Sequence, residues 1–300
     1  MEAPLTKEKL HRFVRRPLDR PFYPTERDEA VLLELFDGLR HTGQLQTLFG
    51  RWIGERLTLL YKAGLVDRPK AQWVWRRQKG GGSKPLVYAL SQQGYTHLRE
   101  RRLVPAMRRD FSERNSDLSA FSSFIAHELG VGDAQVAFKR ASLLRSFELR
   151  HAFAHARGRN TRSLSVPGRE RPLYPDWSFT IRAHGRGASL FFVEVDRCTE
   201  PNVRYGANDL QSLSRKYDGY LRYARAKRHV EQFGIPNFRV LTITIGGDEK
   251  VANVAQTAGE VCDGVGVGRF LVTNFEALEN ADPFEVPWFD ARGNEVRLEV

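Results

Sequence analysis

Cysteine is scarce in this chain, with only Cys198 and Cys262 among 300 residues. Two cysteines so far apart offer neither a disulfide framework nor the paired spacing of a zinc site. The scarcity excludes a small disulfide-stabilised secreted fold. We therefore expect a reducing environment and a cytoplasmic location.

Long apolar runs and phosphate-binding glycine motifs are also missing. No window approaches the roughly 20 apolar residues of a membrane-spanning helix, and the charged first twenty residues do not resemble a secretory signal. The stretch 79–84 lacks the Walker spacing, and the glycine-rich run Gly264–Phe270 leads into a strand rather than a helix. The sequence thus predicts neither membrane contact nor nucleotide hydrolysis.

Positive charge is what the chain has in excess. The formal net charge is +11 and the isoelectric point is about 9.9, with 41% hydrophobic residues, the content of a soluble globular protein. Basic residues crowd 1–110 and 139–171. Such a surplus attracts polyanions, of which nucleic acid is the commonest soluble one, although a merely solvated basic surface is the alternative.

The first third of the chain has the pattern of three helices followed by a basic hairpin. After an irregular arm over 1–20, Thr25 can cap a first helix, with Asp28 three residues later completing a capping box. A short second helix, a third helix over 51–64 and two strands follow. This order is typical of a winged helix-turn-helix.

Basic and aromatic side chains lie off the apolar face of the third helix and on the hairpin. The candidate DNA contacts are Arg51, Trp52, Arg56, Lys62, Arg76, Arg77, Lys79 and Lys84. Guanidinium groups bind phosphates and can read guanine edges in the major groove. The same fold also serves as a protein-interaction module, and the position of the charge favours double-stranded DNA.

The middle of the chain predicts two helices, the first ending near Gly130 and the second beginning at Asp133. On the second helix, Glu148, His151 and His155 share one side. A Glu-x-x-His pair can bind metal in a bundle that holds a second copy, and the chain has none. We expect a structural or phosphate-facing histidine.

The stretch from Tyr174 to Glu200 reads as two strands joined by a glycine-rich loop. Because side chains alternate between the two faces of a strand, Glu194 and Asp196 share a face. If Asp176 lies opposite either of them, the apolar rows of both strands coincide as well. The register therefore predicts that three carboxylates gather at the open end of this hairpin.

Three clustered carboxylates repel one another, at a cost on the order of 4 kcal/mol for a like-charge pair 4 Å apart near a protein surface. A divalent cation would neutralise them, and oxygen ligands suit Mg²⁺ or Mn²⁺. The alternative is a solvated strand end with its charges apart. The following helix, from Asn208, places Lys216 beside its buried face, where it either assists a reaction or forms a plain salt bridge.

Asp176, preceded by proline, and the Glu194-x-Asp196 pair resemble the PD-(D/E)XK nuclease superfamily. The resemblance implies metal ligation by Asp176 and Glu194, with Asp196 as a third ligand from the residue pattern. Position 196 is Asp where the family has its catalytic Lys; some members move this Lys to a helix, which implies Lys216. Glu148 resembles the extra helical acid of many members.

The chain as a whole is more specifically similar to the replication-relaxation family of plasmids and mobile elements. The signature positions are Pro175, Asp176, Glu194, Val195, Asp196, Arg197, Thr199, Glu200, Lys216 and Tyr220. The resemblance implies a winged helix joined to a restriction-endonuclease-like mixed sheet flanked by helices. The expected parts are a basic arm over 1–20, a winged helix over 21–105, a helical linker over 106–132 and a nuclease-like domain over 133–300.

Two functions remain open from the sequence. One is a Mg²⁺-dependent DNA nickase, and the other is a non-catalytic DNA-binding regulator or relaxosome accessory, which Asp at position 196 favours. A tyrosine relaxase finds little support because no His-hydrophobe-His triplet occurs. The expected partners are double-stranded DNA, other plasmid-processing proteins and a second copy of the chain in a homodimer.

Overall fold

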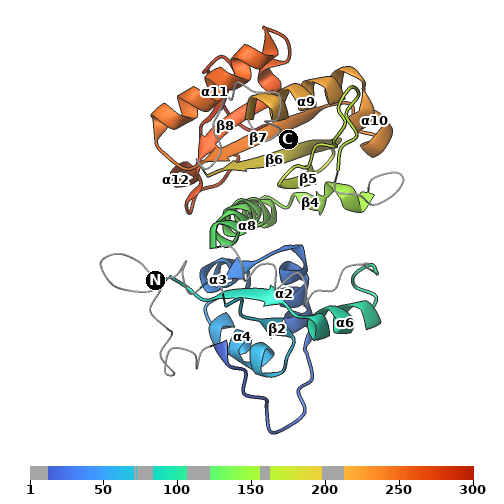
Figure 1. Ribbon diagram of the computed structural model, residues 1–300, viewed down its shortest axis with the longest axis vertical. Helices are drawn as coiled ribbons and strands as arrows, with labels where there is room; N and C mark the ends of the chain where they lie inside the picture. Colours follow the sequence, from blue (N-terminus) through green and yellow to red (C-terminus); the bar gives the residue numbers. More distant parts are fainter. Residues whose placement is uncertain (1–12, 71, 73–83, 107–121, 156–162, 198–212) are drawn as a thin grey trace. The chain divides into compact units, whose positions relative to one another are not determined.

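The computed structural model describes residues 13–70, 72, 84–106, 122–155, 163–197 and 213–300 (Figure 1). The chain divides into two compact units, Met1–Val136 and Ala137–Val300. Cys198, Thr199, Glu200, Asn208 and the strand expected around Trp73 lie outside the described residues. Within the described part, no helix is long and apolar enough to cross a membrane.

The first unit combines short helices with a small sheet. Its elements are α2 (Glu26–Asp37), β1 (Arg40–His41), α3 (Thr42–Phe49), α4 (Ile53–Lys62), β2 (Val66–Asp67), β3 (Val87–Leu90) and α6 (Gln92–Glu100). The strands form an antiparallel sheet in the order β1-β3-β2. The three expected helices are present, and the sequence analysis missed β1 and β2.

The helices of this unit bury one face each. Apolar residues from α2, α3, α4, the sheet and α6 form one core: Val31, Leu32, Leu35, Leu45, Ile53, Leu57, Leu60, Val66, Tyr88, Leu90 and Leu98. At the start of α2, the expected capping box is confirmed, because Thr25 and Asp28 each accept from the backbone of the other. The cap fixes where α2 begins and places the Asp28 carboxylate inside the unit.

Helix α8 (Ser122–Leu144) is continuous, so the expected break near Gly130 and restart at Asp133 are wrong. Gly132 serves close packing instead: a Cβ there would lie 2.8 Å from Gln44 Nε2. Gln44 Nε2 donates to Leu129 O at 2.8 Å, and the buried Arg40 guanidinium bonds Glu34 and Gln135. These contacts join the first part of α8 to the first unit.

The second unit is built on a seven-stranded mixed sheet in the order β10-β9-β8-β7-β6-β5-β4. The strands are β4 (Glu148–His151), β5 (Trp177–Arg182), β6 (Ala188–Asp196), β7 (Phe238–Thr244), β8 (Phe270–Asn274), β9 (Trp288–Asp290) and β10 (Glu295–Val296). β6, β7 and β8 run parallel, and the other pairs are antiparallel. The expected hairpin and mixed sheet are thus present.

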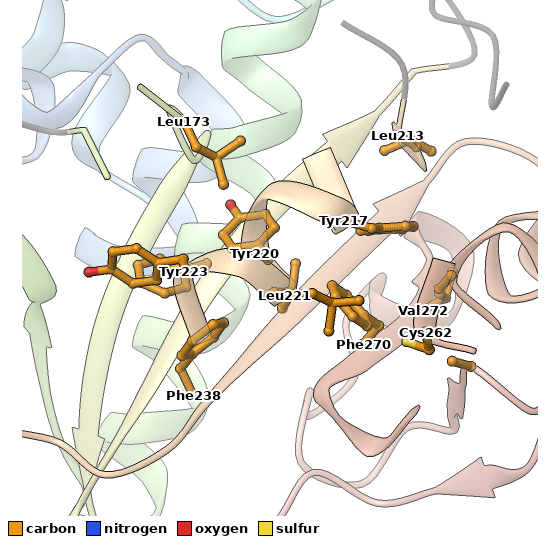
Figure 2. Close-up of a cluster of buried hydrophobic side chains, with 14 of the residues drawn as sticks. Leu173, Leu213, Tyr217, Tyr220, Leu221, Tyr223, Phe238, Cys262, Phe270 and Val272 are labelled. Carbon is orange, nitrogen blue, oxygen red and sulfur yellow. The ribbon is translucent and has the colours of Figure 1, made fainter. Parts of the chain in front are cut away.

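Both faces of this sheet are covered. Helices α9 (Leu213–Arg225) and α11 (Asp248–Cys262) pack on one face (Figure 1). Tyr217, Tyr220 and Tyr223 project from α9 beside Phe238 and Phe270 of the sheet (Figure 2). On the other face, the Phe138 ring of α8 lies 4.8 Å from that of Phe179. The hairpin strands are therefore buried on both sides.

Two further expectations about helices need correction. Glu148 and His151 lie in strand β4, at the edge of the sheet, and not on a helix. The helix expected after the hairpin ends at Arg225 as α9, and a separate helix, α10 (Arg228–Phe233), follows it, because Lys227 adopts a left-handed conformation with φ of 54°. The strand expected at the end of the run Gly264–Phe270 is present as β8, whereas β4, β9 and β10 were not predicted.

Candidate functional site

The register of the β5–β6 hairpin agrees with the expected one. Trp177 pairs with Val193, so Asp176, the residue before β5, comes opposite Glu194. The half-buried Asp176 accepts a hydrogen bond at Oδ2 from the backbone N–H of Val195, at 2.7 Å. Asp176 and Glu194 are thereby brought together at the carboxyl end of β6.

Glu194 is the most enclosed of these acids, with 1% of its surface exposed. Its Oε1 accepts from the Tyr220 hydroxyl at 2.6 Å, and its Oε2 accepts from Lys216 Nζ at 3.0 Å. Both donors come from α9, where they are four residues apart and therefore lie on the same side of the helix. Lys216 thus forms an ion pair with Glu194, a contact that fits both roles that the sequence left open for this lysine.

The electrostatics of Glu194 are unusual for an ion-paired acid. Burial raises its pKa to about 7, and the negative charge of Asp176 adds to the rise. Lys216 and the Tyr220 hydrogen bond act in the opposite direction without cancelling it. Desolvation disfavours the charged form of a carboxyl group, and two donors do not replace full hydration here. Glu194 can therefore exchange a proton near neutral pH.

Asp196 belongs to a second, neighbouring pair. Its Oδ2 accepts from Thr244 Oγ1 at 3.2 Å and lies 3.2 Å from Lys250 Nζ. Thr244 ends β7, and Lys250 stands in the first turn of α11, directly after it. The sequence analysis missed Lys250. Since β6 and β7 are parallel, their carboxyl ends meet at one edge of the sheet. A lysine just after β7 could therefore have been predicted to lie near Asp196.

The sequence predicted that the three carboxylates would together hold one metal ion. Among the described residues, no group of three His, Cys, Asp or Glu side chains could hold a metal ion. Asp176, Glu194 and Asp196 lie on one edge, but Lys216 and Lys250 bind two of them. The oxygen donors suit Mg²⁺ or Mn²⁺ chemically, whereas this arrangement does not assemble all three as ligands.

Glu148 does not join the carboxylates. It pairs in register with Arg182, at the far end of β5 from Asp176, and forms an exposed ion pair with Arg150. His151, three residues on, accepts a hydrogen bond at Nδ1 from Trp177 Nε1 at 3.2 Å. The histidine is structural, as expected. Within the described part of the chain, Glu148 thus lies away from the carboxylate pairs.

The candidate DNA contacts of the first unit differ in their surroundings. Arg51, Trp52 and Lys62 are exposed around α4, and Trp52 has 67% of its surface exposed. Arg56 instead binds Asp28: its Nε donates to Oδ1 at 2.6 Å, and its Nη2 donates to Oδ2. Lys84 is half-buried before β3. Arg76, Arg77 and Lys79 lie outside the described residues.

The comparisons with known proteins agree with the sequence resemblance. No curated protein sequence and no solved structure matches the chain. A family model described as replication-relaxation matches residues 39–237, which is more than half of the chain and includes both α4 and the Glu194 pair. The chain belongs to the replication-relaxation family.

Proposed function

We propose that this protein binds double-stranded DNA through its first unit during the replication or relaxation of a plasmid or other mobile element. Its family membership supports a role related to plasmid or mobile-element replication. The element order α2-β1-α3-α4-β2-β3 supports a winged helix-turn-helix, in which the helix after the turn enters the major groove.

The exposed side chains at the start of α4 carry this proposal. The Arg51 guanidinium lies 5.4 Å from the centre of the Trp52 ring, and both residues precede the first turn of the helix. A helix N-terminus attracts phosphate, a guanidinium binds it, and an exposed indole can pack on sugar or bases. Lys62 adds positive charge at the other end of α4. Arg56, held by Asp28, has a structural role in this proposal.

Duplex binding by the full chain tests the proposal. We expect Arg51→Gln to weaken binding of a 30-base-pair duplex about tenfold, and to reduce the slope of log affinity against log salt concentration by about 0.9, the value for one lost phosphate contact. Fluorescence anisotropy measures both. The matched control is Arg99→Gln, an exposed arginine on α6. Equal binding by the wild type and both variants would contradict the proposal.

Metal-dependent phosphodiester hydrolysis is a second candidate, favoured by one observation. Asp176 and Glu194 lie opposite each other on neighbouring strands, and an ammonium from α9 reaches Glu194. This is the acid pair and displaced lysine that the PD-(D/E)XK resemblance implies. Asp176 and Glu194 would hold the Mg²⁺ ion, which would supply charge neutralisation at the scissile phosphate.

Lys216, Glu194 and Tyr220 could each contribute to hydrolysis of a phosphodiester. Lys216 can orient a water and stabilise negative charge as that water attacks phosphorus and the P–O bond to the leaving sugar oxygen breaks. Glu194, as a ligand of the ion, would stay ionised in this candidate, and bulk water would take the proton that the attacking water loses. Tyr220 holds the Glu194 side chain in place. Against this candidate, Lys216 and Lys250 already neutralise Glu194 and Asp196, which suits a non-catalytic scaffold.

Two measurements decide between hydrolysis and a non-catalytic regulator. Hydrolysis predicts that Mn²⁺ binds the wild type in calorimetry, that supercoiled plasmid is nicked with Mg²⁺ or Mn²⁺, and that Glu194→Gln abolishes both. The matched control is Glu148→Gln, which alters an acid at the opposite end of the hairpin. Duplex binding without metal binding or nicking would support the regulator instead.

A further inference from the structure

The second unit has a pocket at the end of its sheet opposite to Glu194. Its volume is about 670 Å³, and it lies where β6, β7 and β8 begin. The residues that line the pocket include Arg186, Arg239, Arg269, Gly266, Gly268 and Pro236. Ser189 of the pocket and Glu194 are five residues apart on β6, about 17 Å at the usual rise per strand residue. The pocket is therefore separate from the carboxylate pairs.

Three arginines line this pocket, and each donates to a main-chain oxygen. Nη1 of Arg186 donates to Val300 O at 2.7 Å, Nη1 of Arg239 to Glu299 O at 2.9 Å, and Nη1 of Arg269 to Phe238 O at 2.9 Å. For Arg239 and Arg269 this oxygen is a neutral carbonyl, which fixes the direction of the guanidinium but does not balance its charge. A guanidinium has five N–H donors, so donors remain for a ligand.

No described Asp or Glu side chain forms an ion pair with Arg239 or Arg269. The acid that lines the pocket, Glu299, is exposed to solvent. Elsewhere in this unit, arginines do pair with acids: Arg145 binds Asp282 at 2.6 Å, and Arg222 binds Asp218 at 2.8 Å. Arg239 and Arg269 have no such carboxylate partner among the described residues.

Arg269 is the most informative of the three because it is half-buried. Its guanidinium lies 4.3 Å from the centre of the Phe238 ring, and burial lowers its pKa below the usual range. Removing a cation from water is costly unless a counter-charge takes the place of hydration. An anion in the pocket would supply that counter-charge.

We propose that this pocket binds a phosphate-bearing ligand through Arg186, Arg239 and Arg269. The planar guanidinium fork matches phosphate oxygens in two-point contacts. Gly266 and Gly268 lack side chains on one wall, and open space surrounds the position that a Cβ of Gly268 would occupy. Pro236 and its neighbour Ile235 provide an apolar wall for the organic part of the ligand. This proposal does not depend on the proposed function.

Titration of the full chain with inorganic pyrophosphate tests the site. We expect calorimetry to detect binding to the wild type, and Arg239→Gln and Arg269→Gln each to weaken it about tenfold or more, the effect of losing a charge-assisted hydrogen bond. The matched control is Arg228→Gln on α10, which removes an equal charge from an exposed pair with Glu231. Thermal melts confirm folding, and Arg239, close to the surface, remains a valid test if Arg269→Gln does not fold.

Two competitors then identify the source of the phosphate. An unpaired DNA 8-mer that displaces pyrophosphate from the wild type, but less well from Arg239→Gln, indicates a nucleic-acid backbone. Displacement by a mononucleotide alone indicates a small ligand. The proposal is wrong if the wild type does not bind pyrophosphate, or if Arg228→Gln weakens binding as much as Arg239→Gln does.

Discussion

Each unit buries a carboxylate beside a basic side chain, and the two acids behave in opposite ways. Asp28 and Glu194 are exposed by 0% and 1%. Burial alone would raise the pKa of Asp28, but Arg56 and Thr25 together hold it below the usual range. The pKa of Glu194 rises to about 7 in spite of Lys216. Proximity of a cation is therefore not enough to keep a buried acid ionised.

The number and kind of donors explain the difference. Asp28 accepts from two nitrogens of Arg56 and from both the backbone N–H and the hydroxyl of Thr25. Glu194 accepts from one ammonium and one phenol, and Asp176 stands nearby with a like charge. A forked guanidinium with backbone help replaces lost hydration better than a single ammonium does.

The largest difference in stability between the Asp28 and Glu194 pairs should appear when the basic partner of each acid is replaced. Arg56→Met leaves Asp28 buried and charged, and we expect it to destabilise the first unit by about 4 kcal/mol at pH 7. Lys216→Met at pH 6 should cost less, because Glu194 can take up a proton. Hydrogen exchange of the α2 and β6 amides reports each unit separately. Equal losses of stability in Arg56→Met and Lys216→Met would show that the two buried acids do not differ in this way.

The pH dependence of stability should differ in sign between the two acids. Between about pH 4.5 and 7, folded Glu194 binds more protons than the unfolded chain does, so the second unit loses stability as pH rises through this window, by about 3 kcal/mol. Above pH 7 this contribution is constant. Denaturant unfolding of the wild type and Glu194→Gln should show a difference that changes across the window and is flat beyond it.

Asp28 should show the opposite behaviour. Its pKa is lowered in the folded protein, so its contribution is complete above its ordinary value of 3.8 and is lost as pH falls through the lower, folded value. Within pH 4.5 to 7, the first unit should therefore not share the Glu194 trend. A parallel loss of protection in α2 over this range would contradict the comparison.

Tyr220→Phe removes one of the two donors on Glu194 and isolates its effect. The pKa of Glu194 should rise further, and the second unit should lose about 1–2 kcal/mol at pH 8 but less at pH 5. Tyr223→Phe is the matched control, because the Tyr223 hydroxyl donates to Gln232 at 2.6 Å from the same helix. Its cost should not depend on the ionisation of Glu194.

Thr25→Ala should have the smallest effect of the series. It removes a hydroxyl that donates to Asp28 and caps α2, and we expect a loss of about 1 kcal/mol in the first unit. Thr25→Ser should restore most of the stability in the same unfolding measurement. A loss in Thr25→Ala as large as that in Arg56→Met would mean that the guanidinium is not the main partner of Asp28.

Parts of this arrangement could be predicted because they depend on local periodicity. Apolar and polar side chains alternate along β5 and β6, and this alternation sets the register that brings Asp176 opposite Glu194. Helical spacing of apolar residues places Lys216 beside the buried face of α9. The start of α2 follows from the capping residues Thr25 and Asp28. In each case a short stretch of sequence carries the whole signal.

Other parts could not be predicted, because their cause lies far away in the chain. Strand β4 has an exposed, polar sequence, and only pairing with β5 makes Glu148 part of a sheet. Gly130 and Gly132 look like helix breaks until packing near Gln44 is known. Arg56 is 28 positions from its partner Asp28, where sequence spacing gives no guidance, and Lys250, 54 positions from Asp196, can be placed only once β6 and β7 are known to be parallel neighbours.

The lysine that accompanies each buried acid at the carboxyl end of β6 also bears on long-range association. A cluster of uncompensated carboxylates would repel the phosphate backbone of an approaching nucleic acid. Lys216 beside Glu194 and Lys250 beside Asp196 reduce the negative charge of that edge, so it opposes less strongly the attraction of a polyanion to the surplus cations elsewhere. Acetylation of either lysine would turn the edge into a local repulsive patch.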